Sequence, residues 1–164
     1  MTKSELIKRL RTGGRTGERL LVFPKSFLDE PGALHAETIA ESLQVWLKDD
    51  EEIHYGLECG RGDWTWYFVT DRGLLELKSV ERDGQTTTTY RFRPACSLVS
   101  IDVEDVYRMP HGLRQHLQSV TASLRFGAAD EVTISSGADI PPTAESVRLF
   151  VQAIEAIRSR KGGS

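Results

Sequence analysis

The chain of 164 residues, with 39% hydrophobic and 27% charged residues, has the length and composition of a single globular domain. Its formal net charge of −3 at pH 7 excludes a general, charge-driven affinity for nucleic acid. No apolar run approaches the roughly 18 residues that a membrane-spanning helix needs. The first residues also lack the apolar segment of a signal peptide, so we expect a cytoplasmic protein.

Residues 1–50 predict a helical extension with a basic arm at its start. Apolar residues at intervals of three and four predict a short helix at Glu5–Arg11 and a longer one at Ala33–Lys48. The charged side chains of the arm are Lys3, Lys8, Arg9, Arg11, Arg15 and Arg19, against Glu5 and Glu18. Arg9, Arg11 and Arg15 are candidates for contacting an acidic protein or a phosphate backbone. A solvated helix face followed by a linker is the alternative interpretation.

The longer helix carries one apolar stripe that ends near Trp46. We expect this stripe to pack on the rest of the molecule. Alternatively, the stripe and Trp46 bind a partner protein or a second copy of the chain.

After residue 50 the pattern changes to that of β-strands, and its centre is the stretch Trp64–Val80. Two apolar runs, Trp64–Val69 and Leu74–Leu77, flank Thr70-Asp71-Arg72-Gly73, a tetrapeptide typical of a tight hairpin turn. The first run is apolar at both even and odd positions, which predicts a strand covered on both faces.

Alternation of apolar and polar residues predicts the other strands. They are expected at Ile53–Glu58, Thr86–Arg93, Leu98–Val106, Leu117–Phe126 and Glu131–Ser135. Ile53, Tyr55 and Leu57 should share one face of their strand, as should Val99, Ile101 and Val103 of theirs. Arg82-Asp83-Gly84 predicts a second tight hairpin.

The last helix is predicted to begin after Thr143, which can cap it, and to end at Gly162-Gly163. Its apolar side chains form one stripe, consisting of Val147, Phe150, Val151, Ile154 and Ile157. Burial of that stripe would contribute roughly 1.5–3 kcal/mol per side chain as an upper bound, so we expect the helix to belong to the core.

Seven strands followed by one amphipathic helix resemble a bacterial pleckstrin homology-like (PH-like) domain. The resemblance is carried by Glu51-Glu52-Ile53, by Trp66–Leu74 with its Thr-Asp-Arg turn, and by Pro94–Ile101. It implies an α+β, mainly β fold over residues 51–161. That fold is a seven-stranded antiparallel bent barrel capped by the C-terminal helix, with residues 1–50 as an N-terminal helical extension. It also implies a binding or scaffolding module.

The resemblance by itself specifies no ligand. Members that bind phosphoinositides place basic residues around the first two strands and their loop. Here that loop offers Arg61 next to Asp63, and the following strand Trp64–Thr70 has no lysine or arginine. These differences argue against binding of inositol lipids.

Patterns typical of catalytic and metal sites are missing from the sequence. His111 and His116, or His35 and His54, have no spacing that sets a metal geometry, so we expect no metal or cofactor. No Gly-x-Ser-x-Gly motif is present. Cys59 and Cys96 are too few for a disulfide framework and are expected to be buried free thiols, as in a cytosolic protein. We therefore expect a protein that is not an enzyme.

The sequence favours an interaction module that binds another protein, with a homo-oligomer as a further possibility. The second hypothesis is an anionic-ligand binder, contacting nucleic acid or a membrane surface through the basic N-terminal arm. Besides the arm and Trp46, the candidate contact residues are Arg61 and the ends of the loop Arg108–Arg114, which contains His111. The alternative interpretation of the segment Arg108–Arg114 is a surface loop without a binding role.

Overall fold

The computed structural model describes residues 31–48, 51–59, 64–108, 116–137 and 142–161. The predicted helix Glu5–Arg11 and the basic arm lie outside this part of the chain. The described elements are α2 (Pro31–Trp46), β1 (Ile53–Cys59), β2 (Trp64–Thr70), β3 (Gly73–Arg82), β4 (Gln85–Pro94), the 3-10 helix η2 (Ala95–Ser97), β5 (Leu98–Arg108), β6 (His116–Phe126), β7 (Asp130–Ser135) and α3 (Ala144–Lys161). All seven predicted strands and both longer helices are confirmed, with ends that shift by a few residues.

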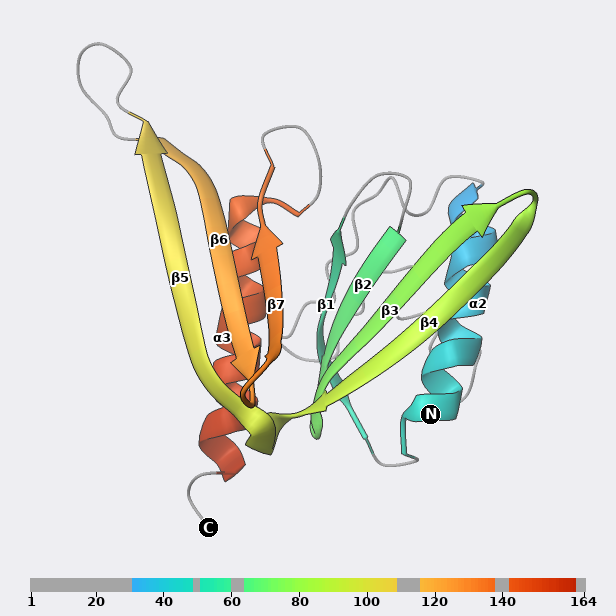
Figure 1. Ribbon diagram of the computed structural model, residues 1–164, viewed down its shortest axis with the longest axis horizontal. Helices are drawn as coiled ribbons and strands as arrows, with labels where there is room; N and C mark the ends of the chain where they lie inside the picture. Colours follow the sequence, from blue (N-terminus) through green and yellow to red (C-terminus); the bar gives the residue numbers. More distant parts are fainter. Residues whose placement is uncertain (1–30, 49–50, 60–63, 109–115, 138–141, 162–164) are drawn as a thin grey trace.

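The strands form two antiparallel sheets that diverge from a common corner (Figure 1). The first has the order β1-β2-β3-β4 and the second the order β5-β6-β7. The predicted barrel is not confirmed, because no strand pairing joins the two sheets within the described residues. The reason lies at the corner between β4 and β5. Pro94 has no backbone N–H, and η2 turns the chain there before pairing can continue.

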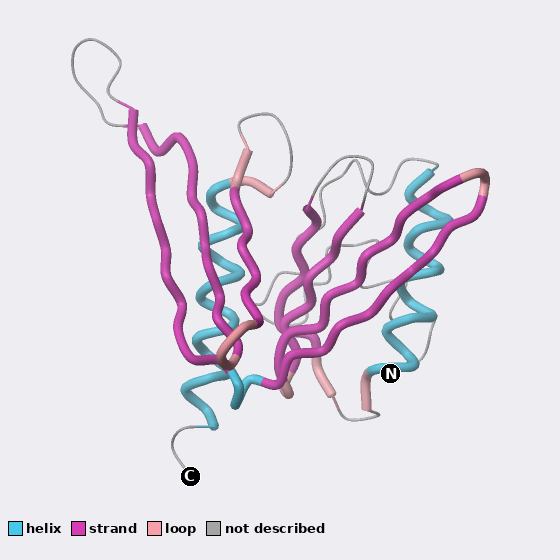
Figure 2. The backbone as a smooth tube through the Cα atoms, in the orientation of Figure 1, coloured by secondary structure: helices cyan, strands magenta, loops and turns pink. Residues whose placement is uncertain are grey.

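The tight turns follow the predicted chemistry. Asp83 and Gly84 both have positive φ, 52° and 72°, as a two-residue hairpin of the type I′ kind requires. They connect β3 and β4, which pair from Gly73–Pro94 to Arg82–Gln85 in the long hairpin visible in Figure 2. The other predicted turn, at Asp71 and Arg72, connects β2 to β3.

Helix α3 fills the space between the two sheets, packing on β6 and β7 from one and on β1 and β2 from the other. Its complete predicted stripe is buried in the core cluster shared by both sheets. Phe150 lies between Tyr55 and Tyr67, with ring centroids 6.4 and 6.2 Å away. The predicted cap is also present, since the N–H of Ser146 donates to Oγ1 of Thr143 at 3.1 Å.

Helix α2 covers the opposite face of the four-stranded sheet. Among its described side chains, the buried apolar ones are Ile39, Ala40 and Leu43, and they form a second core cluster with Trp66, Phe68, Leu75 and Leu77. Tyr67 and Val69 of β2 instead join the cluster around α3. The expectation that β2 is covered on both faces is therefore confirmed.

Two irregularities in strand pairing change the predicted faces. A register shift between Ile53 and Tyr55 turns Ile53 toward the α2 cluster, whereas Tyr55 faces α3. A second shift between Leu98 and Ser100 leaves Val99 exposed. The predictions of a common face in β1 and in β5 were wrong at these positions, because a strict period of two does not accommodate an inserted residue.

Replacement of Gly73 by alanine tests how closely the chain packs at the corner. A Cβ atom at Gly73 would lie 2.1 Å from the carbonyl oxygen of Arg93, so the backbone would have to move. We expect Gly73→Ala to lower the free energy of unfolding in urea by more than about 2 kcal/mol. The control Gly84→Ala meets no atom within 4 Å and should cost only about 1 kcal/mol, from its positive φ. Equal losses in the two variants would contradict this packing.

Candidate functional site

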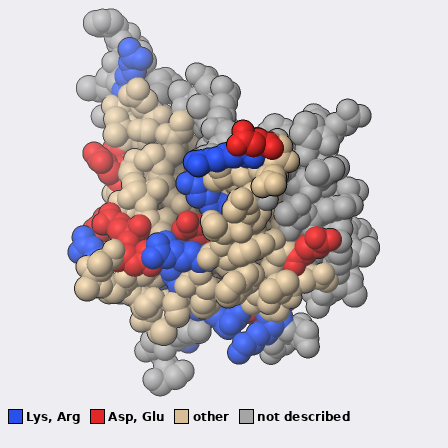
Figure 3. Space-filling model, turned by 45° about the vertical axis from the view of Figure 1, so that its right-hand side comes forward, with Lys and Arg blue, Asp and Glu red and all other residues tan. Residues whose placement is uncertain are grey.

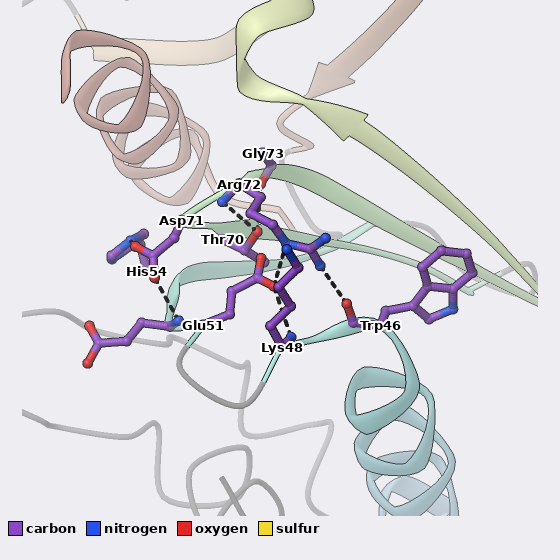
Figure 4. A network of polar contacts seen from close by, with 9 residues as sticks. Trp46, Lys48, Glu51, His54, Thr70, Asp71, Arg72 and Gly73 are labelled. Carbon is purple, nitrogen blue, oxygen red and sulfur yellow. Dashed lines mark hydrogen bonds and ion pairs between the residues drawn. The ribbon is translucent and has the colours of Figure 1, made fainter. Parts of the chain in front are cut away.

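The turn between β2 and β3 is the centre of a polar network that connects α2 to the sheet (Figure 4). Nε of Arg72 donates to Oε2 of Glu51 at 2.7 Å, and its Nη2 donates to the carbonyl oxygen of Trp46 at 2.6 Å. Glu51 is buried and also accepts the backbone N–H of Lys48. Arg72 thus holds the end of the helix and the entry to β1 together.

Asp71 anchors the start of β1 from the same turn. It accepts the backbone N–H of Glu52 at 2.8 Å and contacts Nε2 of the buried His54 at 2.5 Å. Partial burial acts to raise the pKa of Asp71, but these two partners and nearby Arg160 outweigh it and lower the pKa. The carbonyl oxygen of Arg72 accepts the N–H of Ala95, so the turn also holds the β4–β5 corner. Every one of these contacts is internal, and the network is therefore structural.

A second ion-pair cluster connects the two sheets. Arg93 of β4 is 4% exposed, and it donates to Glu76 at 2.7 Å and to Asp130, at the start of β7, at 2.9 Å. Its guanidinium also lies 5.8 Å from the centre of the Phe126 ring. Two carboxylates and a ring face occupy this cation, so it is not available to an anionic ligand.

The predicted contact residues are only partly in the described chain. Those that lie outside it are Arg9, Arg11, Arg15, Arg61 and Arg114. Arg108 is exposed at the end of β5, and Trp46 is partly exposed at the end of α2. The ends of β5 and α2 lie on opposite sides of the molecule in Figure 1, so the structure does not bring these two residues together.

The large exposed apolar side chains of the described chain lie at the end of α2, on β4 and along β5. Val45 and Trp46 lie at the end of α2, and the Trp46 ring lies 5.9 Å from the ring of Tyr90 of β4. Those on β5 are Val99, Val103, Val106 and Tyr107, which are 40–55% exposed. The sequence pattern placed Val99, Ile101 and Val103 on one face of this strand and identified none of them as a contact residue, so this surface was not predicted.

Strand β5 is the outer strand of its sheet, and α3 supports it on one side. Nη2 of Arg148 donates to Asp105 and to the hydroxyl of Tyr107, and Nη2 of Arg158 donates to the carbonyl oxygen of Val99 at 3.3 Å. These contacts hold both ends of β5 against the helix. The strand is therefore positioned by the fold, although its own side chains contribute little to the core.

Among the described residues, no three His, Cys, Asp or Glu side chains lie close enough together to hold a metal ion. The cysteines are free, but the prediction that both are buried was wrong. Cys96 is exposed because it lies in the η2 corner, and Cys59 is partly buried. None of the described helices is long and apolar enough to cross a bilayer.

Charge on the visible described surface is mixed. In Figure 3 lysine and arginine side chains lie beside aspartate and glutamate side chains, with uncharged areas between these groups. That face does not provide the continuous basic surface that would follow a phosphate backbone.

Glu58 of β1 is the buried acid with an unusual environment. Its side chain is 4% exposed, and its Oε2 atom has no hydrogen-bond partner. Burial raises the pKa of Glu58 to about 7. Glu58 lies opposite Trp66 in the pairing of β1 with β2.

Comparison by structure identifies the architecture. A pleckstrin homology domain from Shewanella amazonensis SB2B aligns with a TM-score of 0.51 and 16% identity, covering 74% of this chain and 96% of that one. The fold is that of a PH-like domain. The hSac2 domain of the human phosphoinositide phosphatase Sac2 aligns equally well, with a TM-score of 0.51 and 11% identity, over 80% of this chain and 85% of that one. Comparison by sequence finds no matching protein family and no matching curated protein.

Removal of the Arg72 guanidinium tests the network at the turn. Arg72→Met would leave the buried carboxylate of Glu51 without its cation, and we expect the free energy of unfolding to fall by roughly 3 kcal/mol. Arg91→Met is the matched control, since Arg91 is largely exposed and lies 3.6 Å from Asp130, and it should cost less than about 1 kcal/mol. Similar losses in urea denaturation of both variants would contradict the assignment.

The pH dependence of stability tests the burial of Glu58. The folded protein keeps this proton up to about pH 7, whereas the unfolded chain loses it near the ordinary value of 4.5. The folded state therefore binds more protons between these values, and stability falls as the pH rises through them. Glu58→Gln removes this fall. As the pH rises from about 4 to about 8, the free energy of unfolding of the variant should therefore increase by up to about 3 kcal/mol relative to that of the parent. Parallel pH profiles would contradict the prediction.

Proposed function

We propose that this chain is a non-enzymatic PH-like interaction module that binds another protein, and that it acts in the cytoplasm. The observation that carries the proposal is the grouping of exposed apolar side chains on β5, an outer strand held in place by α3. Single exposed apolar residues are ordinary on a protein surface, but groups of them mark sites of association.

The internal use of polar groups also supports a binding role over catalysis. Arg72, Arg93, Asp71 and Glu51 are engaged in contacts that hold the elements together. Catalytic groups would be expected to meet in a concave site with free donors and acceptors. The unpartnered oxygen of Glu58 is buried, and Glu58 lies opposite Trp66 in the strand pairing.

Inositol-lipid binding is not the function that we favour, although one structural neighbour is a domain of a phosphoinositide phosphatase. Strand β2 has no basic residue, and the one fully buried arginine of β4 is neutralised by Glu76 and Asp130. Binding of nucleic acid or an anionic membrane through Arg9, Arg11 and Arg15 stays a prediction. It would show as binding that falls steeply with salt and is lost when the three become alanine.

Affinity capture with the full chain tests the proposed function. The bait is incubated at physiological salt with an extract of its native host, alongside the surface variants Val103→Asp and Trp46→Ala. We expect at least one protein to be retained by the parent chain and reduced at least about tenfold by one of the two variants. The proposal would be overturned if the parent chain retained no protein, or if both variants retained every captured protein as well as the parent does. Arg82→Ala, on the β3–β4 hairpin, serves as the control that should bind like the parent.

A further inference from the structure

We propose that β4 is the interface between two copies of this chain, which pair through their β4 strands in antiparallel orientation and so form one continuous sheet. The inference goes beyond the proposed function, because it assigns a second surface and a second kind of partner. It does not involve the exposed side chains of β5.

The backbone of β4 is open for pairing on one side. The strand lies at the border of the four-stranded sheet and pairs only with β3 within the described residues (Figure 1). Since Arg82 and Gln85 flank a two-residue turn, they exchange hydrogen bonds with each other, and the direction of the backbone groups alternates beyond them. The N–H and C=O groups of Thr86, Thr88 and Tyr90 therefore point away from β3.

This edge lacks the devices that block strand pairing. Proteins usually protect an outer strand with charged side chains, proline, bulges or a covering segment. The stretch Gln85–Tyr90 contains no charged residue and no proline, and the pairing of β4 with β3 has no register shift. Its side chains are exposed or partly exposed wherever they are described. The basic residues and the proline of the strand lie beyond this stretch, at Arg91, Arg93 and Pro94.

The charges at the two ends of this stretch make it complementary to itself. Asp83 precedes the stretch and Arg91 follows it, so in an antiparallel pair each acid approaches the base of the other copy. Asp83 is exposed, and the side chain of Arg91 is 63% exposed, so both charges are accessible. Opposite charges in neighbouring strands stabilise their pairing, and the twofold symmetry supplies this contact twice.

This charge pairing selects one register, in which Thr87 lies on the twofold axis. Thr88 of one copy then pairs with Thr86 of the other, and both contribute backbone groups that point outward. Thr87 itself lies opposite Thr87 of the second copy, at a position without backbone hydrogen bonds between the two. The register therefore satisfies the open edges of both strands.

The remaining cross-strand pairs are compatible with this register. Gln85 would lie opposite Thr89 on the face that carries Thr87, so uncharged polar side chains meet there. On the other face Tyr90, which is 38% exposed, would lie opposite Gly84. A Cβ atom built at Gly84 meets nothing within 4 Å, so the Tyr90 ring of the second copy has room there.

The mass of the purified full chain in solution tests the inference. In sedimentation equilibrium at about 100 µM we expect twice the mass of the 18.4 kDa chain, with a dissociation constant below this concentration. Arg91→Glu and Asp83→Lys each place like charges together twice, so each variant alone should dimerise at least about tenfold more weakly. An equimolar mixture of the two variants forms both ion pairs again, and its heterodimer should match the parent dimer within about threefold. Val103→Asp, on β5, is the control that should dimerise like the parent.

Cysteine cross-linking tests the position of the axis. The background variant Cys96→Ser removes the exposed thiol. In it, Thr87→Cys places two thiols opposite one another with Cα atoms about 4.5 Å apart, which a disulfide can bridge. We expect oxidation with copper phenanthroline to give a dimer that a reductant dissociates in denaturing gels. Thr89→Cys is the matched control on the same face, since its two copies would lie about 13 Å apart and should not cross-link.

Several results would overturn the inference. A parent chain that is monomeric at about 100 µM excludes the dimer, and a dimer that Val103→Asp dissociates has its interface on β5. A mixture of the charge variants without heterodimers, or equal cross-linking at Thr87 and Thr89, excludes the register. These measurements use the purified chain alone, so their failure leaves the proposed function intact, and a failure of affinity capture leaves the dimer intact.

Discussion

The two-sided burial of β2 is the constraint on which the rest of the structure depends. Trp66 and Phe68 pack beneath α2, whereas Tyr67 and Val69 pack toward α3 and the second sheet. The four-stranded sheet is consequently a middle layer, and neither helix can be removed without exposing a large apolar face. The hairpin β2–β3 is the element through which both core clusters are connected.

The polar contacts are arranged around that layer and act mainly as connections between elements. Arg72 ties α2 to the sheet, Asp71 ties the turn to β1, and Arg93 ties the first sheet to the start of β7. Each pairs a wholly or partly buried group with a specific partner, so each constrains the geometry as well as contributing energy. Among the described residues, the exposed apolar side chains that remain for association lie on β5, at the end of α2 and at Tyr90 of β4.

Much of the fold could be predicted because its helices, turns and caps depend on residues that are close together in the sequence. The stripe from Val147 to Ile157 has the helical period, Asp83-Gly84 supplies the residues that a tight hairpin needs, and Thr143 caps the helix that follows it. The Glu51-Glu52 lead-in and the Thr-Asp-Arg turn were recognised only as a resemblance. Their physical role, a network with contacts such as that between Arg72 and Glu51, 21 positions apart, could not be derived from spacing.

The sequence by itself determined the number and order of the strands, the amphipathic helices and the apolar character of both faces of β2, because these depend on neighbours along the chain. Only the tertiary structure decided that the strands divide into two sheets at Pro94, that Ile53 and Val99 leave their expected faces, and that β5 stays open. The physical reason is that the exposure of a side chain depends on which element, distant in the sequence, packs against it. Val99, Val103 and Val106 of β5 would suit a buried face equally well, but they are exposed because α3 reaches β5 mainly through its arginine side chains and packs more closely on β6 and β1.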